Sequence, residues 1–316
     1  LKDVEGEGKG TYDDAVAYVV ELRRKLIEVV VDADGKAKPA RVGWAIAPCE
    51  LNRNRHSVIE PIPADRDLLV IRFDDLNGKP IATLVNYAAH PTVHPPQNRK
   101  FTAEFPGVMM RAVEEKLGAP CAFIQGAAGD LQCEMDDSLW GKQDFMEPIG
   151  KALAAQVLKL NDAIETRVPM DPSIRFMDES FDFEMRMDLL NPAVQSLFGA
   201  AYFPEIVRAI ANDVVDGNGR IHPRLSTVLL NGELFIVGVS GEFFCNHAIR
   251  LKRRAHGVTT LFAGYCNGHH MYFPTIEAAA EGGYGASPQS AWVELGGPEQ
   301  MMHTALIHLY TMLGKY

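Results

Sequence analysis

The sequence has few cysteines and no pattern that would join them into a framework. The five are Cys49, Cys121, Cys133, Cys245 and Cys266, and none of them forms a Cys-x-x-Cys pair. Their wide spacing excludes the disulfide framework of a small secreted domain, and the lack of close pairs argues against a zinc knuckle built from thiolates. We therefore expect buried free thiols.

The sequence also lacks long apolar runs and an excess of positive charge. No apolar run reaches the roughly 20 residues that cross a bilayer, so we predict no transmembrane segment in this chain. The net charge of -10 argues against a nucleic-acid partner, which needs clustered cations. The one basic cluster, residues 250–254, is interpreted as a solvent-exposed helix face. The oligomeric state is left open.

No repeat, low-complexity segment or long linker divides the sequence, so we predict a single domain over residues 1–316. The chain begins at Leu1 without a methionine or a signal sequence, and residues 2–9 are mostly polar. We expect that an N-terminal portion of the native protein is missing. The absence of a targeting signal therefore indicates no compartment.

Hydrophobic periodicity predicts helices that alternate with strands. Helices are expected over residues 11–30, 103–117, 146–160, part of 204–215, 243–254 and 298–313. Strands are expected over residues 41–47, 67–73, 81–87, 121–125, 174–178, 181–184, 226–230, 234–239 and 259–263. The dipeptides Asn77-Gly78 and Asn231-Gly232 indicate two hairpins. We therefore predict an α/β fold with a mixed β-sheet core flanked by helices.

Polar groups follow three of the expected strands. His90 comes after the run 81–87, Gly129-Asp130 after 121–125, and Glu242 after 234–239. Side chains that bind or react tend to lie in such loops at strand ends. The pattern predicts one shared site.

His90 and His94 are four residues apart, but Pro91, Pro95 and Pro96 prevent a helix there. They cannot be the paired histidines of a helical zinc motif. Either of them could be a metal ligand presented by a loop, or a surface or hydrogen-bonded histidine without such a role.

The loop 126–130 and the residue Glu242 each allow two interpretations. Amides of the glycine-rich loop can stabilise an oxyanion, or the loop can be a tight strand-to-helix turn. No Gly-Lys-Ser/Thr follows it, so a nucleotide P-loop is excluded. Glu242 is expected to open a helix, where the helix dipole favours a carboxylate, or to bind a metal.

Residues 264–274 follow another expected strand and are rich in polar aromatic side chains. The pair His269-His270 invites a metal interpretation. Adjacent residues of an extended chain point in opposite directions, so we expect at most one of the two histidines to face the site.

The segments 52–55, 90–92, 126–130, 241–243 and 265–272, taken in this order, resemble the neutral/alkaline (non-lysosomal) ceramidase family. The resemblance covers most of the chain. Each motif is short, and the specificity comes from their order and spacing.

The resemblance implies a zinc-dependent enzyme that cleaves the amide bond of N-acylsphingosines. It places His90, Glu242 and Tyr272 on zinc ligands and Tyr284 on a second tyrosine near the reacting carbonyl. It places Arg53 and Arg55 on a segment that lines the substrate site. It also favours a secreted or extracytoplasmic location, although the compartment is otherwise unknown.

The sequence departs from the family in two places within the expected site. The family's first histidine ligand belongs to a segment upstream of Leu1, and Gln132 stands where ceramidases carry a serine. A glutamine cannot act as a nucleophile. The carboxy-terminal immunoglobulin-like domain of ceramidases is also absent from a chain that stops at Tyr316.

These observations predict a zinc hydrolase of the ceramidase type that acts on an N-acyl amide, or on an ester. The metal would polarise the carbonyl and lower the pKa of water toward about 7. Tyr284 with Arg53 or Arg55 would stabilise the oxyanion. The residues expected to line the substrate pocket are His94, Asn98, Asp130 and Gln132.

Two other functions stay open. One is a catalytically inactive relative that binds a lipid or a glycan. The other is a serine hydrolase, because Gly238-Val239-Ser240 begins like a nucleophile elbow. Glu242 stands where that motif requires its second glycine, so the motif is incomplete.

Overall fold

The computed structural model describes residues 13–95, 97, 100–139, 141–189, 191–199 and 212–316. Contacts divide the chain into two compact units, one of residues 1–39 and 187–222, the other of residues 40–186 and 223–316. Helices alternate with strands in parallel and antiparallel sheets, so the predicted α/β class is confirmed. Within the described ranges no helix combines the length and the apolarity that a membrane crossing requires.

The smaller unit contains α1 (Asp13–Gly35), α4 (Pro192–Gly199) and β9 (Arg220–Ile221). The helix expected over 11–30 is confirmed as α1. The helix expected within 204–215 falls mainly outside the described residues.

In the larger unit, one sheet has the order β1-β3-β4-β5. Its strands are β1 (Ala40–Pro48), β3 (Asp67–Asp75), β4 (Pro80–Tyr87) and β5 (Cys121–Gln125). The first three are antiparallel, and β5 runs parallel to β4. Residues 68–71 are all buried, as expected for a strand covered on both faces.

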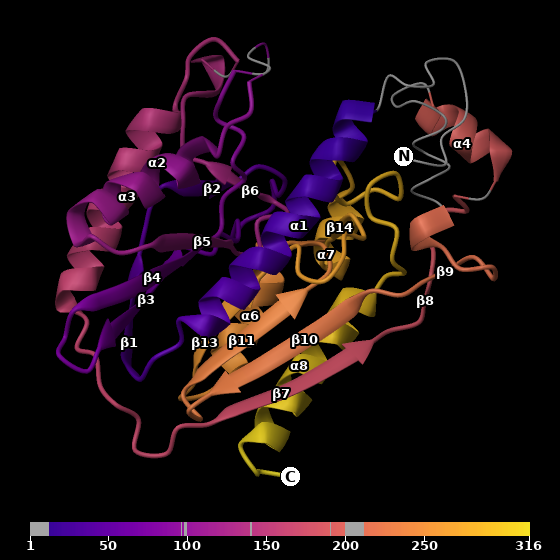
Figure 1. Ribbon diagram of the computed structural model, residues 1–316. Helices are drawn as coiled ribbons and strands as arrows, with labels where there is room; N and C mark the ends of the chain where they lie inside the picture. Colours follow the sequence, from indigo (N-terminus) through magenta and orange to yellow (C-terminus); the bar gives the residue numbers. More distant parts are fainter. Residues whose placement is uncertain (1–12, 96, 98–99, 140, 190, 200–211) are drawn as a thin grey trace. The chain divides into compact units, whose positions relative to one another are not determined.

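Two helices, α2 (Glu104–Leu117) and α3 (Met146–Ala163), lie together on this sheet (Figure 1). Their buried Phe105 and Leu153 pack into one cluster with Leu68 and Val85 of the strands. Leu69 and Ile71 point the other way and pack with apolar residues of the second sheet. The main core of the larger unit therefore lies on both sides of β3.

The second sheet has the order β13-β11-β10-β7. Its strands are β7 (Ile174–Ser180), β10 (Arg224–Leu230), β11 (Leu234–Val239) and β13 (Thr259–Ala263). Strands β11 and β13 are parallel and the other neighbours are antiparallel. The hairpin at Asn231-Gly232 is confirmed, with φ of +54° and +69° as a tight two-residue turn requires.

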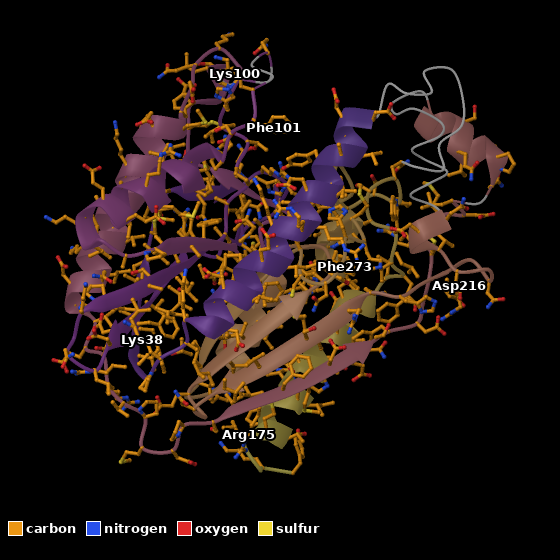
Figure 2. The ribbon with its side chains drawn as sticks, in the orientation of Figure 1. Lys38, Lys100, Phe101, Arg175, Asp216 and Phe273 are labelled. Atoms are coloured by element: carbon orange, nitrogen blue, oxygen red, sulfur yellow. The ribbon has the colours of Figure 1, made fainter. Side chains whose placement is uncertain are left out.

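The helices α6 (Cys245–Arg254) and α8 (Gly297–Met312) pack against the second sheet and against each other (Figure 1). Arg175 on β7 donates a hydrogen bond to the Met312 carbonyl at the end of α8, and Figure 2 labels Arg175 on this strand. Phe273, also labelled there, is fully buried. All five cysteines are free thiols, as predicted; four are buried, whereas the prediction of burial is wrong for Cys266, which is half-buried.

Several short elements were not predicted, because segments of two to six residues carry little periodicity. They are β2 (Asn52–Asn54), β6 (Leu131–Cys133), η1 (Asp137–Leu139), β12 (Glu242–Phe243), β14 (Tyr272–Phe273) and α7 (Ile276–Glu281). The strand expected over 181–184 appears as the shorter β8 (Phe183–Glu184). Strand β2 pairs with β6, and β12 pairs in parallel with β14. The prediction that Glu242 opens a helix is wrong, because α6 begins only at Cys245 and Glu242 pairs with Tyr272.

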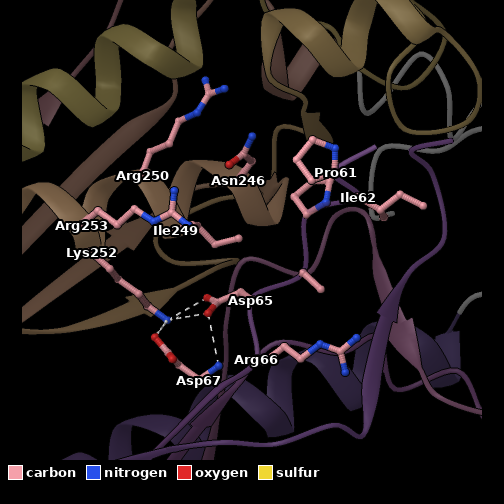
Figure 3. Close-up of a pocket in the computed structure, with 12 residues that line it drawn as sticks. Pro61, Ile62, Asp65, Arg66, Asp67, Asn246, Ile249, Arg250, Lys252 and Arg253 are labelled. Carbon is pink, nitrogen blue, oxygen red and sulfur yellow. Dashed lines mark hydrogen bonds and ion pairs between the residues drawn. The ribbon is translucent and has the colours of Figure 1, made fainter. Parts of the chain in front are cut away.

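The prediction that the basic cluster 250–254 is wholly solvent-exposed is wrong for Lys252. Its side chain is 16% exposed, and its amine lies 2.8 Å from Asp65 and 3.1 Å from Asp67 (Figure 3). Arg253 and Arg254 are exposed as expected. Ion pairs with two carboxylates from a distant segment thus keep the Lys252 side chain partly buried.

Candidate functional site

The three predicted strand ends lie close together, because backbone hydrogen bonds join them. The His90 amide donates to Leu131, and the Gly129 amide donates to Phe243. The Gly264 amide, which follows β13, donates to Gln125 at the end of β5. In sheets with parallel strands, the carboxyl ends of the strands are where ligands usually bind. The site is built at this edge.

His90 and Glu242 contact each other at this edge. His90 is 8% exposed, and its Nε2 lies 3.0 Å from Oε2 of Glu242. Its Nδ1 lies 3.0 Å from the Leu131 carbonyl. A carbonyl oxygen only accepts, so Nδ1 carries the proton in this bond. The Nε2 of His90 is therefore directed at the carboxylate, as expected for an imidazole that is oriented to bind.

Glu242 has two further partners that the sequence did not assign. The Tyr265 hydroxyl donates to Oε2 at 2.9 Å, and His269 Nε2 donates to Oε1 at 3.3 Å. Burial acts to raise the pKa of Glu242, but hydrogen bonds from His269, His90 and Tyr265 outweigh it and lower the pKa. Glu242 is thus a stable carboxylate in a largely buried position.

Of the histidine pair, His269 bonds Glu242, whereas His270 Nδ1 lies 3.0 Å from the Ser240 carbonyl. The expectation that at most one of them faces the site is confirmed. The many polar aromatic side chains of residues 264–274 indicated that this segment belongs to the site. They did not indicate which side chains reach the carboxylate of Glu242.

Arg55 links several of the candidate residues. Its Nη2 lies 3.2 Å from His90 Nε2 and 3.3 Å from the Tyr272 hydroxyl, and it donates to the Gly129 carbonyl at 3.1 Å. Its guanidinium carbon lies 5.9 Å from the ring centre of Tyr284, within cation–π range.

Arg53, the other candidate arginine, is directed elsewhere. Its Nε lies 3.7 Å from a carboxylate oxygen of Glu134, the residue that follows β6. Of the two arginines, Arg55 is the one whose contacts are with His90 and Tyr272. The sequence left these alternatives open, and the contacts favour Arg55.

Tyr272 and Tyr284 form a second contact pair beside Arg55. Their hydroxyls are 3.5 Å apart and their rings meet edge to face. Tyr272 is 4% exposed, whereas Tyr284 is 71% exposed. Burial, the hydroxyl of Tyr284 and the charge of Glu242 raise the pKa of Tyr272, so it is a neutral phenol here. A bound divalent cation has the opposite effect on a neighbouring phenol.

Asp130, expected to line the substrate pocket, is bonded within the protein. It is 3% exposed, and its Oδ1 accepts from the Cys245 amide at 2.6 Å, at the first residue of α6. Its Oδ2 accepts from Asn54 at 2.8 Å, and its backbone carbonyl accepts from the Arg55 amide at 2.8 Å. Burial raises the pKa of Asp130. Asp130 therefore ties the segment that carries Arg55 to the start of α6.

The other expected pocket residues lie in different places. Gln132 is half-buried on β6, in register with Arg53 and joined by a β-bridge to His90. His94 belongs to a separate group, with Nδ1 at 3.0 Å from Asp144 and its amide bonded to Glu104. Asn98 lies outside the described residues.

Ser240, the candidate nucleophile of a serine hydrolase, is fully buried. Its hydroxyl oxygen accepts from the Arg224 amide at 2.7 Å and lies 3.1 Å from His270 Nδ1. A buried hydroxyl that already accepts a backbone hydrogen bond is not placed to attack a substrate. The structure gives the serine hydrolase no nucleophile at this position.

The donors at His90 and Glu242 fit zinc in kind. The Nε2 of His90 lies 3.0 Å from the carboxylate oxygen, and an imidazole nitrogen and a carboxylate oxygen are both common zinc ligands. The two side chains are close enough to bind one divalent cation. Among residues the structure describes, no three His, Cys, Asp or Glu side chains form a cluster that could hold a metal. The described set is thus an imidazole, a carboxylate and the phenol of Tyr272.

No family model matches the sequence, and no curated protein matches it. Solved structures do match the fold. One, described as a ceramidase complexed with C2, has a TM-score of 0.69 and 16% identity over 90% of this chain and 55% of that chain. The chain has a ceramidase-like fold. A neutral ceramidase from Pseudomonas aeruginosa gives a TM-score of 0.66 at 16% identity, over 89% and 53%. The chain thus spans about half the length of these ceramidases.

Gly129 offers a direct test of how the strand ends are joined. A Cβ at this position would lie 2.6 Å from the Glu242 carbonyl oxygen and 2.8 Å from the Phe244 ring. We expect Gly129→Ala to displace the Glu242 backbone, lower the free energy of unfolding by about 1–3 kcal/mol and reduce any site activity about 100-fold. Urea denaturation and an activity assay measure the two effects.

The matched control is Gly35→Ala, where a Cβ meets no atom within 4 Å. It should leave both quantities nearly unchanged. A Gly129→Ala variant as stable and as active as the wild type would show that the tight contact with Glu242 is not needed. The amide of Gly129 is already bonded to Phe243, so the close approach serves the protein's own backbone and leaves this amide unavailable to an oxyanion.

Proposed function

We propose that this chain is the catalytic part of a zinc-dependent hydrolase of the neutral ceramidase type, which cleaves the amide bond of an N-acyl substrate. The observation that carries the proposal is a chain of contacts between side chains from four separate segments. Arg55 lies 3.3 Å from Tyr272 and 3.2 Å from His90, and His90 lies 3.0 Å from Glu242. The ceramidase-like fold supports it.

In this proposal His90, Glu242 and Tyr272 hold the metal. When bound, zinc polarises a carbonyl and lowers the pKa of water, which supplies a nucleophile without a reactive side chain. The chain's own residues do the rest. Leu131 fixes the orientation of the His90 ring, and the hydrogen bonds on Glu242 keep it ionised at neutral pH.

Arg55 and Tyr284 are proposed to stabilise the negative charge that develops on the carbonyl oxygen. The guanidinium of Arg55 is fixed by the Gly129 carbonyl and lies against the exposed ring of Tyr284. Donors fixed in advance in a partly buried site stabilise a developing charge more strongly than water does. Tyr284 is the exposed member of the pair and so is open to a substrate.

Gln132 bears on which substrate is accepted. It stands at the serine position of ceramidases and is bridged to His90. We propose that Gln132 shapes the pocket beside the metal. The proposed substrate is ceramide or another N-acyl compound. The same substitution favours the second candidate function, an inactive relative that binds a lipid or a glycan.

The two arginines give a matched test of the enzyme. Arg55→Ala should reduce kcat/KM for hydrolysis of short-chain N-acylsphingosines and simpler N-acyl amides about 100- to 1000-fold, because a charge-stabilising donor is lost. Arg53→Ala removes an equal charge directed at Glu134 and should change kcat/KM less than about fivefold. Release of the fatty acid by the zinc-loaded protein is the measurement.

Hydrolysis that survives Arg55→Ala but is lost with Arg53→Ala would reverse the assignment. A wild-type protein that binds these amides or related lipids but hydrolyses none of them would support the inactive binder.

A further inference from the structure

The carboxylate of Glu242 is engaged at both oxygens. Oε2 lies 3.0 Å from His90 and accepts from Tyr265 at 2.9 Å, whereas Oε1 accepts from His269 at 3.3 Å. A carboxylate held at one oxygen can still rotate, but one held at both has its plane fixed. Tyr265 and His269 therefore determine how Glu242 faces His90.

Tyr265 and His269 support each other. Their rings are stacked, with centroids 5.9 Å apart and planes 9° from parallel. The His269 side chain is 50% exposed and Tyr265 is 39% exposed, so neither is held by burial alone. Stacking restricts the rotation of both side chains and keeps both donors on the carboxylate.

The backbone that carries this pair is in an unusual conformation. Tyr265, Asn267 and Met271 have φ values of +58°, +60° and +61°, which non-glycine residues adopt rarely. Such conformations cost about 1–3 kcal/mol each and cluster at functional sites, where the surroundings hold them in place.

The surroundings of this segment are the strand that carries Glu242. The Cys266 amide donates to Val239 at 2.7 Å, the Tyr265 amide donates to Gly241 at 3.3 Å, and the Glu242 amide donates to Met271 at 2.8 Å. The strained segment is thus hydrogen-bonded at both ends to residues 239–242, the segment whose side chain it holds.

We infer that Tyr265 and His269 are positioning residues, which together fix the carboxylate of Glu242 against His90 and so set the affinity of the site for a divalent cation. The part of the inference that concerns cation affinity rests on the proposed function, because it assumes that the site binds a divalent cation. The orientation of Glu242 is a separate property of the protein.

The first experiment compares two neighbouring histidines. His269→Ala should weaken Zn²⁺ binding, measured by isothermal titration calorimetry, about 10- to 100-fold, as loss of an orienting partner does at metal sites. His270→Ala is the matched control, because that ring bonds Ser240 rather than Glu242, and it should leave the zinc affinity within about threefold. Tyr265→Phe removes one hydroxyl, keeps the ring stack, and should weaken binding in the same direction.

The second experiment does not depend on a metal. Crystal structures of the metal-free wild type and of His269→Ala and Tyr265→Phe should show Glu242 turned away from His90 Nε2 in the variants only. His269→Gln restores a side-chain donor and should recover part of the zinc affinity. The fold of each variant is checked by circular dichroism and thermal unfolding.

The outcomes separate this inference from the proposed function. A wild type without zinc affinity, with Glu242 rotated in the variants, supports the positioning role and contradicts the zinc hydrolase. Glu242 in the wild-type orientation in both variants overturns the inference, whatever the zinc affinity. Equal loss of affinity in His269→Ala and His270→Ala also overturns it, because the effect would not depend on the bond to Glu242.

Discussion

Replacing His90 by alanine is expected to reduce bound zinc from about one ion per chain to less than a tenth of that. His90 is the buried imidazole that contacts Glu242, and its orientation is set by the Leu131 carbonyl. Zinc in a catalytic site is held by about three protein ligands, so loss of one removes a large share of the affinity. Metal analysis after dialysis of the full chain gives the ratio.

His94→Ala is the matched control for this prediction. It removes an imidazole only four residues away that lies against Asp144 instead of Glu242, and the bond from the His94 backbone amide to Glu104 stays in place. Its zinc content should equal that of the wild type. If His90→Ala keeps one zinc per chain, or if His94→Ala loses it, the proposed metal ligands are incorrect. A metal-free wild type whose lipid or glycan binding survives His90→Ala would identify a binding protein.

Replacing Lys252 by alanine is expected to lower the free energy of unfolding by about 3–5 kcal/mol, because Asp65 would be left as a buried and unpaired charge. The carboxylate of Asp65 is 6% exposed and lies 2.8 Å from the Lys252 amine. Burial acts to lower the pKa of Lys252, but Asp65 and Asp67 outweigh it and hold the pKa above its usual value. Urea denaturation at pH 7 measures the loss.

The pH dependence of this ion pair follows from the raised pKa. Its stabilisation is fully present below the unfolded-state pKa of lysine, about 10.4, and is lost as the pH rises through the higher folded-state value. The difference between wild type and Lys252→Ala should therefore persist from pH 7 to 10 and shrink above that.

Two further variants test the ion-pair explanation. Arg253→Ala removes an exposed charge from the same helix and should cost less than about 0.5 kcal/mol. The double variant Asp65→Asn with Lys252→Met removes both charges and should be more stable than Lys252→Ala, because no unpaired charge remains. A Lys252→Ala variant that loses less than about 1 kcal/mol would contradict the burial of the pair.

Periodicity predicted the elements that are long enough to show it. The strand expected over 67–73 and the helix expected over 146–160 appear as β3 and α3 with slightly wider bounds. The pairs β2–β6 and β12–β14 could not be predicted, because each forms between segments far apart in the chain. For the same reason the helix boundary near Glu242 was misplaced: pairing with Tyr272 extends this residue as a strand.

The site residues that directly follow a predicted strand could be predicted from the sequence. His90 and Glu242 each follow an apolar run, and the structure brings them together. The family resemblance added Arg55 and Tyr272, whose contacts lie beside them. Their roles stay predictions.

Tyr265 and the separate role of His269 could not be predicted. The direction of their side chains depends on left-handed backbone conformations, which leave no clear pattern in the sequence. Asp130 was read as a pocket residue because its loop is rich in glycine. Only the structure shows that both its oxygens are used internally.

The buried carboxylate of Asp130 has a consequence for how the protein loses activity on heating. The Asp130 carboxylate accepts hydrogen bonds from the Cys245 amide in the first turn of α6 and from Asn54, and the Asp130 backbone carbonyl accepts one from the Arg55 amide. Fraying of that helix end would loosen the segment that carries Arg55 while both sheets stayed intact. Inactivation is therefore expected to begin below the melting temperature of the whole molecule.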